Sequence, residues 1–199
     1  RSSQQRIGVF GGTFDPPHVG HLVTAINVAY ALELDPFILM VNNVPWQKVG
    51  ARPITPALDR LAMVEAAVAG VPRLVAGDWE IRAGGPSYTA DTLRVLREEF
   101  PAADLFVVLG DDAAAGIHTW ERADEVIAQS HLVVVDRPGQ PVDLDPHVEW
   151  TRIEVPRLEV SSTDLRDRWV DGRPLDYLIT EDVLEVIAER GLYGQAMRP

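Results

Sequence analysis

Cysteine is absent from the sequence, and its absence excludes disulfide bonds, thiol nucleophiles and thiolate metal ligands. A chain without disulfides fits a reducing compartment, so we expect a cytoplasmic location. Also absent is any run of the roughly 20 apolar residues that a membrane-spanning helix needs. The N-terminus leads directly into an apolar strand, without the hydrophobic segment of a secretory signal, so we expect the protein to be soluble.

Positive charge is scarce. The chain has 18 Lys and Arg against 30 Asp and Glu, a formal net charge of -12 at pH 7. Nucleic acids and anionic membranes favour basic faces, so we expect neither as a partner, and a phosphate ligand would need a local positive site. With 199 residues, 46% of them hydrophobic, the chain can enclose one sizeable core. We therefore predict one domain over residues 1–199, with a C-terminal helical part at about 161–193.

Short apolar runs alternate with segments of helical periodicity along the chain. Strands are predicted at residues 7–10, 37–41, 73–76, 105–109, 132–135 and 148–155, and helices at 19–34, 57–69, 89–99, 120–128, 161–170 and 180–190. Residues 137–147 hold three prolines and a glycine, which predicts a surface loop. The alternation predicts an α/β fold, a Rossmann-like doubly wound parallel sheet with helices on both faces.

Two of these helices carry a further prediction about which side chains face the core. For the helix at 57–69 the predicted apolar face consists of Leu58, Leu61, Met63, Val64 and Val68. For the helix at 89–99 we predict Thr89 and Asp91 as caps and a core side of Leu93, Val95 and Leu96.

The first strand runs into Gly11-Gly12, and the next helix begins near Pro17. Glycines permit backbone conformations closed to other residues and allow a ligand to approach the chain closely. The N-terminus of a helix attracts anions through its unpaired N–H groups and its dipole. His18 and His21 are three residues apart and so lie on one side of the first turn, with the small Gly20 between them. The combined pattern predicts a polyphosphate site, although the glycines alone would fit a tight turn equally well.

Other ligands fit this pattern less well. A zinc site at His18 and His21 lacks further ligands, because cysteine is absent and the other histidines are distant in sequence. The chain has no G-x-x-x-x-G-K-[ST] motif, and Gly-Gly-Thr-Phe-Asp does not match G-x-G-x-x-G.

The segment Gly11 to Leu22, Gly-Gly-Thr-Phe-Asp-Pro-Pro-His-Val-Gly-His-Leu, resembles the signature of bacterial nicotinate-mononucleotide adenylyltransferases, which carry the H-x-G-H motif of the nucleotidyltransferase superfamily. The segment Val160 to Arg166 is similar to the superfamily's I-S-S-T-x-x-R motif. The resemblance covers nearly the whole chain, through Asn42-Asn43-Val44-Pro45, Ser87-Tyr88-Thr89, Gly110-Asp111-Asp112, Trp120, Arg137-Pro138-Gly139 and Gly191-Leu192-Tyr193. One departure is Gln47, where the family commonly has histidine.

The resemblance implies transfer of the adenylyl group of ATP to nicotinate mononucleotide in NAD biosynthesis, giving nicotinate adenine dinucleotide and pyrophosphate. It implies direct in-line displacement without a covalent intermediate, with Mg²⁺ arriving on the ATP phosphates. A homo-oligomer is compatible with it. A sister enzyme acting on nicotinamide mononucleotide or phosphopantetheine stays an alternative, as does a catalytically silent nucleotide-binding module. A fragment of a class I aminoacyl-tRNA synthetase is disfavoured, because the chain is short and acidic.

The same resemblance assigns residues to roles. The catalytic residues would be His18, His21 and Arg166. The ATP-binding residues would be Gly11, Gly12, Thr13, Phe14, His18, His21, Lys48, Gly110, Asp112, Arg137, Ser161, Ser162, Thr163 and Arg166, and the mononucleotide-binding residues Asn43, Thr89 and Trp120. We predict no metal ligand supplied by the protein.

Each of these residue types also has an ordinary structural interpretation. Arg166 could be a surface residue paired with Asp164 or Asp167, and Lys48 a solvated loop lysine. Asp112 could be a helix cap, and Trp120 a core residue like the other four tryptophans, which we predict to be packing or loop residues.

Overall fold

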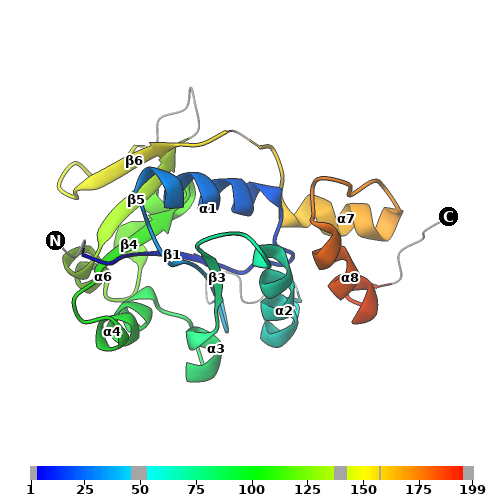
Figure 1. Cartoon of the computed structure of the whole chain (residues 1–199), viewed down its shortest axis with the longest axis horizontal. Helices are drawn as coiled ribbons and strands as arrows, with labels where there is room; N and C mark the ends of the chain where they lie inside the picture. Colours follow the sequence, from blue (N-terminus) through cyan, green and yellow to red (C-terminus); the bar gives the residue numbers. More distant parts are fainter. Residues whose placement is uncertain (1–3, 46–52, 137–142, 157, 195–199) are drawn as a thin grey trace.

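The computed structural model describes residues 4–45, 53–136, 143–156 and 158–194 (Figure 1). In chain order its elements are β1 (Arg6–Gly12), α1 (Val19–Ala31), β2 (Phe37–Val41), α2 (Ala57–Val68), β3 (Leu74–Gly77), α3 (Trp79–Ala83), α4 (Thr89–Glu99), β4 (Asp104–Leu109), α5 (Asp111–Ala115), the 3-10 turn η2 (Ile117–Thr119), α6 (Ala123–Gln129), β5 (His131–Asp136), β6 (Trp150–Glu154), α7 (Ser162–Asp171) and α8 (Glu181–Glu189).

The six strands form one sheet in the order β3-β2-β1-β4-β5-β6, and every neighbouring pair is parallel. The chain therefore winds outward from β1 in one direction through β2 and β3, and in the other from β4 through β5 and β6. Ligands of such sheets bind where the direction reverses, at the carboxyl ends of the strands. In this fold that point lies after β1 and β4, and the predicted fold class is confirmed.

Helices cover both faces of the sheet, and successive residues of a strand point to opposite faces. In β4, Phe106 and Val108 join one core with α1 and α2, whereas Leu105, Val107 and Leu109 join the other with α4 and α6. The central strands are buried on both sides, which explains their continuous apolar runs. Figure 1 shows α1 on the opposite side of the sheet from α4 and α6.

The two C-terminal helices lie at the α2 end of the molecule, away from α4 and α6 (Figure 1). Helix α8 packs on α2. The buried Leu165 and Trp169 of α7 and Val183 and Ile187 of α8 belong to the same core cluster as the side chains beneath α1. No helix within the described ranges has both the length and the apolar character to cross a membrane.

Several predicted details are wrong. Leu58 and Val95 are 66% and 38% exposed, so neither belongs to a core face. Met63, Val64 and Val68 are buried as predicted, and Arg60 and Ala67 complete the buried face of α2. The N-cap of α4 is Tyr88, whose side chain makes no capping hydrogen bond, and Thr89 and Asp91 lie inside the helix, so they are not its N-cap.

Some boundaries also differ. The first helix ends at Ala31, α6 begins at Ala123 rather than at residue 120, and the last strand spans only Trp150–Glu154. Two helices of five residues, α3 and α5, were not predicted. Of the predicted loop at 137–147, residues 137–142 lie outside the described part of the chain.

Candidate active site

Two adjoining cavities open at the carboxyl ends of β1 and β4. The larger has a volume of about 720 Å³ and the smaller about 250 Å³. They share the wall formed by Phe10, Gly11, Gly12, Thr13, Gly110 and Ala113. Two cavities that share a wall can hold two ligands with their reacting groups close together.

The two histidines lie at the start of α1, beside the larger cavity. His18 is the N-cap residue, and its ring centroid is 3.7 Å from that of His21. The backbone N–H of His18 donates to Nδ1 of His21 over 3.2 Å. Because Nδ1 of His21 accepts, the proton of a neutral His21 ring is on Nε2.

His18 is buried, and burial lowers its pKa from 6.5 to about 4. In the ligand-free protein the ring is therefore neutral at pH 7. Its Nδ1 atom is buried without a hydrogen-bond partner among the described residues. An unpartnered nitrogen at the wall of a cavity costs free energy that a ligand can recover by bonding to it.

The N-terminus of helix α7, which belongs to the C-terminal part of the sequence, lines the same cavity. Ser161 caps it by accepting from the backbone N–H of Asp164 over 3.2 Å. Arg166 donates to the carbonyl oxygen of Asp15 over 2.6 Å and to Oγ1 of Thr163 over 3.1 Å. The carboxylate of Asp164 pairs instead with Arg168 and Arg173. Arg166 therefore lies beside the cavity.

Asp15 connects the loop before α1 to the C-terminal part of the chain. It is 1% exposed, and Oδ1 accepts from the phenol of Tyr193 over 2.7 Å. The neighbouring carbonyl of Pro16 accepts a hydrogen bond from the Ser162 hydroxyl over 2.8 Å. The backbone N–H of Val19 donates to the carbonyl oxygen of Leu178 over 2.9 Å. The loop is thus held by the α7 N-terminus, the α7–α8 connection and the final turn.

Two glycines are needed for space rather than for unusual backbone angles. A Cβ on Gly12 would lie 2.7 Å from the ring of Phe14, and one on Gly20 would lie 3.0 Å from Nδ1 of His18. The positive φ of this loop belongs to Phe14, at 49°, and not to Gly11 or Gly12. The glycines therefore let the side chains of the loop pack against strand and helix.

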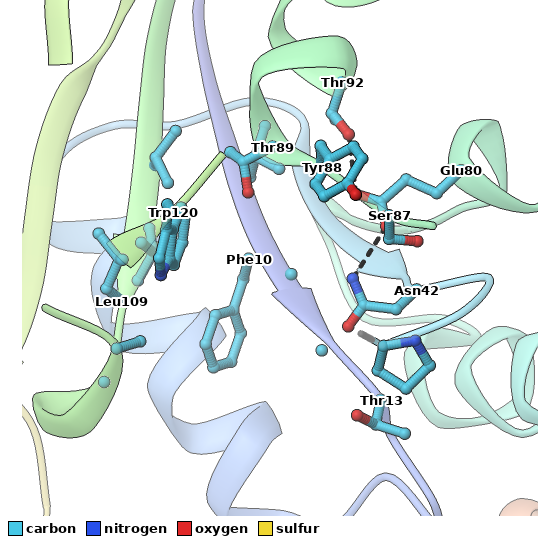
Figure 2. Close-up of a pocket in the computed structure, with 18 of the residues that line it drawn as sticks. Phe10, Thr13, Asn42, Glu80, Ser87, Tyr88, Thr89, Thr92, Leu109 and Trp120 are labelled. Carbon is cyan, nitrogen blue, oxygen red and sulfur yellow. Dashed lines mark hydrogen bonds between the residues drawn. The ribbon is translucent and has the colours of Figure 1, made fainter. Parts of the chain in front are cut away.

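The smaller cavity lies between β2, α4 and the segment after α5 (Figure 2). Thr89, the first residue of α4, and Trp120 both line it. So do Asn42 and the buried Glu80. Asn43 is not among the residues that line it, and its side-chain NH₂ group donates to the Gly85 carbonyl over 2.9 Å.

The cavities collect most of the predicted site residues. Lining the larger one are Gly11, Gly12, Thr13, Phe14, His18, His21, Gly110, Asp112, Ser161, Ser162, Thr163 and Arg166. The N-cap of α5 is Gly110, so Asp112 is not a cap; it lies in the first turn of the helix and is exposed. Three residues named from the sequence lie outside the described part of the chain: Lys48, Arg137 and the divergent Gln47. Most of the segment from residue 42 to 52 also lies outside it, so the sequence question of whether this segment is open or closed stays unanswered.

Sequence reasoning missed four side chains that support the site: Asp15, Arg60, Glu80 and Tyr193. Arg60 is 1% exposed and donates to the carbonyls of Thr13, Asn43 and Thr55. The spacing of Arg60 to Met63, Val64 and Ala67 would have placed it on the core side of α2, which is an unusual position for arginine.

Residues 9–168 match the family model described as cytidylyltransferase-like. A relative from Acidothermus cellulolyticus, named "Probable nicotinate-nucleotide adenylyltransferase", is 43% identical over 196 residues, covering 94% of each chain. A relative of the same name from Leifsonia xyli is 44% identical over 193 residues, covering 96% of this chain and 95% of its own.

Among solved structures, the chain is similar to Plasmodium falciparum nicotinic acid mononucleotide adenylyltransferase complexed with APC or with NaAD. Each superposition has a TM-score of 0.75 at 16% identity and covers 96% of this chain and 98% of the other. At this identity the likeness establishes the fold.

Proposed function

This chain belongs to the nicotinate-nucleotide adenylyltransferases of the cytidylyltransferase-like family, and we propose that it transfers the adenylyl group of ATP to nicotinate mononucleotide. The products are nicotinate adenine dinucleotide and pyrophosphate, which places the reaction in NAD biosynthesis. One observation carries the assignment of substrates to positions: two cavities share a wall at the ends of β1 and β4.

The larger cavity suits ATP. It brings together two helix N-termini, those of α1 and α7, with two imidazoles and a guanidinium. This is a polyphosphate environment in a chain that is otherwise strongly acidic. The smaller cavity suits the mononucleotide, with the pyridine ring against Trp120 and its carboxylate near the start of α4 at Thr89.

The reaction is an in-line displacement at the α-phosphorus of ATP. A phosphate oxygen of the mononucleotide forms the new P–O bond while the bond to the oxygen bridging the α- and β-phosphates breaks, and that electron pair leaves with pyrophosphate. The attacking oxygen is already an anion, so the protein needs no strong base. Its work is to position the two phosphates and to stabilise the charge that develops.

We assign His21 to the α-phosphate, His18 to the β- or γ-phosphate and Arg166 to the departing pyrophosphate. The Nε2 proton of His21 is a fixed donor. Arg166 can exchange its bond to the Asp15 carbonyl for two bonds to pyrophosphate, because a guanidinium presents donors in a planar fork. Thr13, Ser161, Ser162 and Thr163 supply hydroxyl and backbone donors around the phosphates.

Mg²⁺ is proposed to arrive on the ATP phosphates, where it would neutralise charge on the outer oxygens. The described residues include no group of three or more His, Asp and Glu side chains that could hold a metal ion. Mg²⁺ tends to keep its waters and to bind mainly through phosphate oxygens, so ATP itself would supply its ligands. The cytoplasmic location and the compatibility with a homo-oligomer stay predictions.

Pyrophosphate release from ATP and Mg²⁺ tests the function, with nicotinate mononucleotide, nicotinamide mononucleotide and phosphopantetheine supplied in turn. We expect turnover with nicotinate mononucleotide far above the other two. Turnover only with another acceptor would overturn the substrate and keep the reaction class. Binding of ATP without turnover on any acceptor would favour the silent nucleotide-binding module.

A further inference from the structure

Glu80 places a carboxylate in the wall of the smaller cavity, and the proposed chemistry gives it no role. It comes from the short helix α3 and is 8% exposed. Oε1 accepts from the Thr92 hydroxyl over 2.7 Å, and Oε2 accepts from the amide nitrogen of Asn42 over 2.8 Å. Neither partner is charged, and among the described residues Glu80 has no salt bridge. Burying a carboxylate is costly, and these two hydrogen bonds offset part of that cost.

The bond to Glu80 fixes the orientation of the Asn42 side chain. An ionised carboxylate accepts hydrogen bonds and cannot donate them, so the Asn42 NH₂ group must face Glu80. The oxygen of that amide is then left for the cavity. Figure 2 shows it turned away from Glu80, toward the side where Thr13 and Phe10 lie.

The backbone around Asn42 is equally fixed. Its N–H donates to the Gly12 carbonyl over 3.0 Å, and the preceding Val41 is in register with Gly12 across the β1–β2 pair. The Asn42 oxygen therefore presents an acceptor beside the wall that the two cavities share.

A mononucleotide has few groups that can bond to an acceptor. At neutral pH the phosphate and the pyridine carboxylate of nicotinate mononucleotide are acceptors themselves, whereas its ribose hydroxyls donate. In the proposed arrangement the ribose lies between the ring at Trp120 and the phosphate at the shared wall. We propose that Glu80 is a positioning residue, which holds Asn42 so that its amide oxygen accepts a hydrogen bond from a ribose hydroxyl of the mononucleotide. This inference rests on the proposed function.

The experiment compares nicotinate mononucleotide with its 2′-deoxy and 3′-deoxy analogues, using kcat/KM from pyrophosphate release. For the wild type we expect removal of one of the two hydroxyls to lower kcat/KM about 10-fold, because a buried acceptor loses its partner. In Glu80→Gln the new side chain can donate or accept a hydrogen bond, so the side-chain amide of Asn42 can rotate by about 180° and exchange its oxygen and nitrogen. The penalty for that analogue should then fall to about 2-fold, as the acceptor is no longer held in place.

Asn42→Ala and Asp78→Asn serve as the second variant and the matched control. Asn42→Ala removes the acceptor itself, so it should also lose the hydroxyl preference. Asp78 is a neighbouring carboxylate whose exposed pair with Arg82 lies on the surface, so Asp78→Asn should keep the wild-type ratio. The KM for ATP should change little in Glu80→Gln, because Glu80 lines the smaller cavity and not the larger one.

The possible failures are distinguishable. Absence of wild-type turnover with intact nicotinate mononucleotide would overturn the proposed function itself. Wild-type turnover that is equal for all three mononucleotides would overturn only the ribose contact. A Glu80→Gln enzyme that keeps the full wild-type penalty would show that Asn42 is oriented without Glu80, and would overturn the positioning role.

Discussion

His21 meets both requirements for a charge-stabilising donor, since its tautomer is fixed and it lies at a helix N-terminus. Its Nδ1 accepts from the backbone of His18, which leaves the proton on Nε2. We expect His21→Ala to lower kcat about 10²- to 10³-fold, the effect of losing one preorganised donor.

The His21 ring also takes part in the N-terminal cap of α1, so stability must be measured beside activity. Circular dichroism and a thermal melt of the variant would establish that it is folded at the assay temperature. An unchanged kcat in a folded His21→Ala protein would remove this residue from the mechanism.

His18 should take up a proton when ATP binds. Burial holds its pKa at about 4 in the free protein, and a polyphosphate beside the ring would raise it by favouring the imidazolium. At pH 6 the bound form would then hold more protons than the free form, so ATP affinity should fall as pH rises through the pKa of the complex. Calorimetric titration at pH 6 in two buffers of different ionisation enthalpy measures the uptake.

Two variants test whether His18 is the group that takes up the proton. His18→Gln should abolish the buffer dependence, whereas a change at the exposed His118 should preserve it. Binding heats that are independent of the buffer in the wild type would contradict the assignment.

The depressed pKa of His18 also predicts how stability varies with pH. The unfolded chain protonates this histidine below about pH 6.5, whereas the folded protein does so only near pH 4. Its contribution to the free energy of unfolding is therefore fully present above pH 6.5 and is lost as the pH falls toward 4. Urea titrations of the wild type and His18→Gln at pH 7 and pH 5 would measure this, and an equal loss in both proteins would contradict it.

At the scale of elements, the final turn is joined to the loop before α1 by a hydrogen bond. The Tyr193 phenol donates to the buried Asp15 carboxylate, and burial together with that carboxylate raises the pKa of the phenol. We expect Tyr193→Phe to raise the KM for ATP several-fold and to destabilise the fold by about 1–3 kcal/mol, because a buried charged acceptor loses a donor. The KM for nicotinate mononucleotide should change less, since Asp15 lines only the larger cavity.

Tyr177 provides the matched control, because it is 95% exposed. Tyr177→Phe should leave both KM values and the melting temperature unchanged. If Tyr193→Phe behaved like Tyr177→Phe, the final turn would have no influence on the ATP site.

The elements that could be predicted from the sequence are those whose own residues decide them. The central strands are buried on both faces and read as continuous apolar runs, and β2 was located at its observed ends. Helices α3 and α5 are too short to show a period. Met63, Val64 and Val68 of the predicted α2 face are buried, but Arg60 was missed because it is a polar residue at a core position, where it donates to three carbonyls.

The same distinction applies to the site. His18, His21 and the Ser161–Thr163 segment lie at helix starts that local spacing reveals. The pairs Asp15–Tyr193 and Glu80–Asn42 join residues 178 and 38 positions apart. Nothing local marks such partners, so only the fold identifies them.

At the scale of the whole molecule, net charge and site charge have opposite signs. The chain carries a formal charge of -12, yet both proposed substrates are anions. The attraction must therefore come from helix N-termini and a few cations at the larger cavity, and not from the long-range field. Such local attraction acts at close range, where bulk salt screens it least.

The shared core predicts that the chain unfolds as one unit, as the predicted single domain requires. Trp169 of α7 and Ile187 of α8 belong to the same buried cluster as Val108 and Val133 of the sheet. Thermal melts should therefore have one midpoint, whether they are followed by far-UV circular dichroism or by the fluorescence of Trp169. The Trp169 signal is the difference between the fluorescence of the wild type and that of Trp169→Phe. ATP at about 100 times its Kd should shift both probes together, by an amount equivalent to about 2.7 kcal/mol. If the Trp169 signal melted first, and ATP raised only that transition, the C-terminal helices would be a separate unit that the ligand attaches to the sheet.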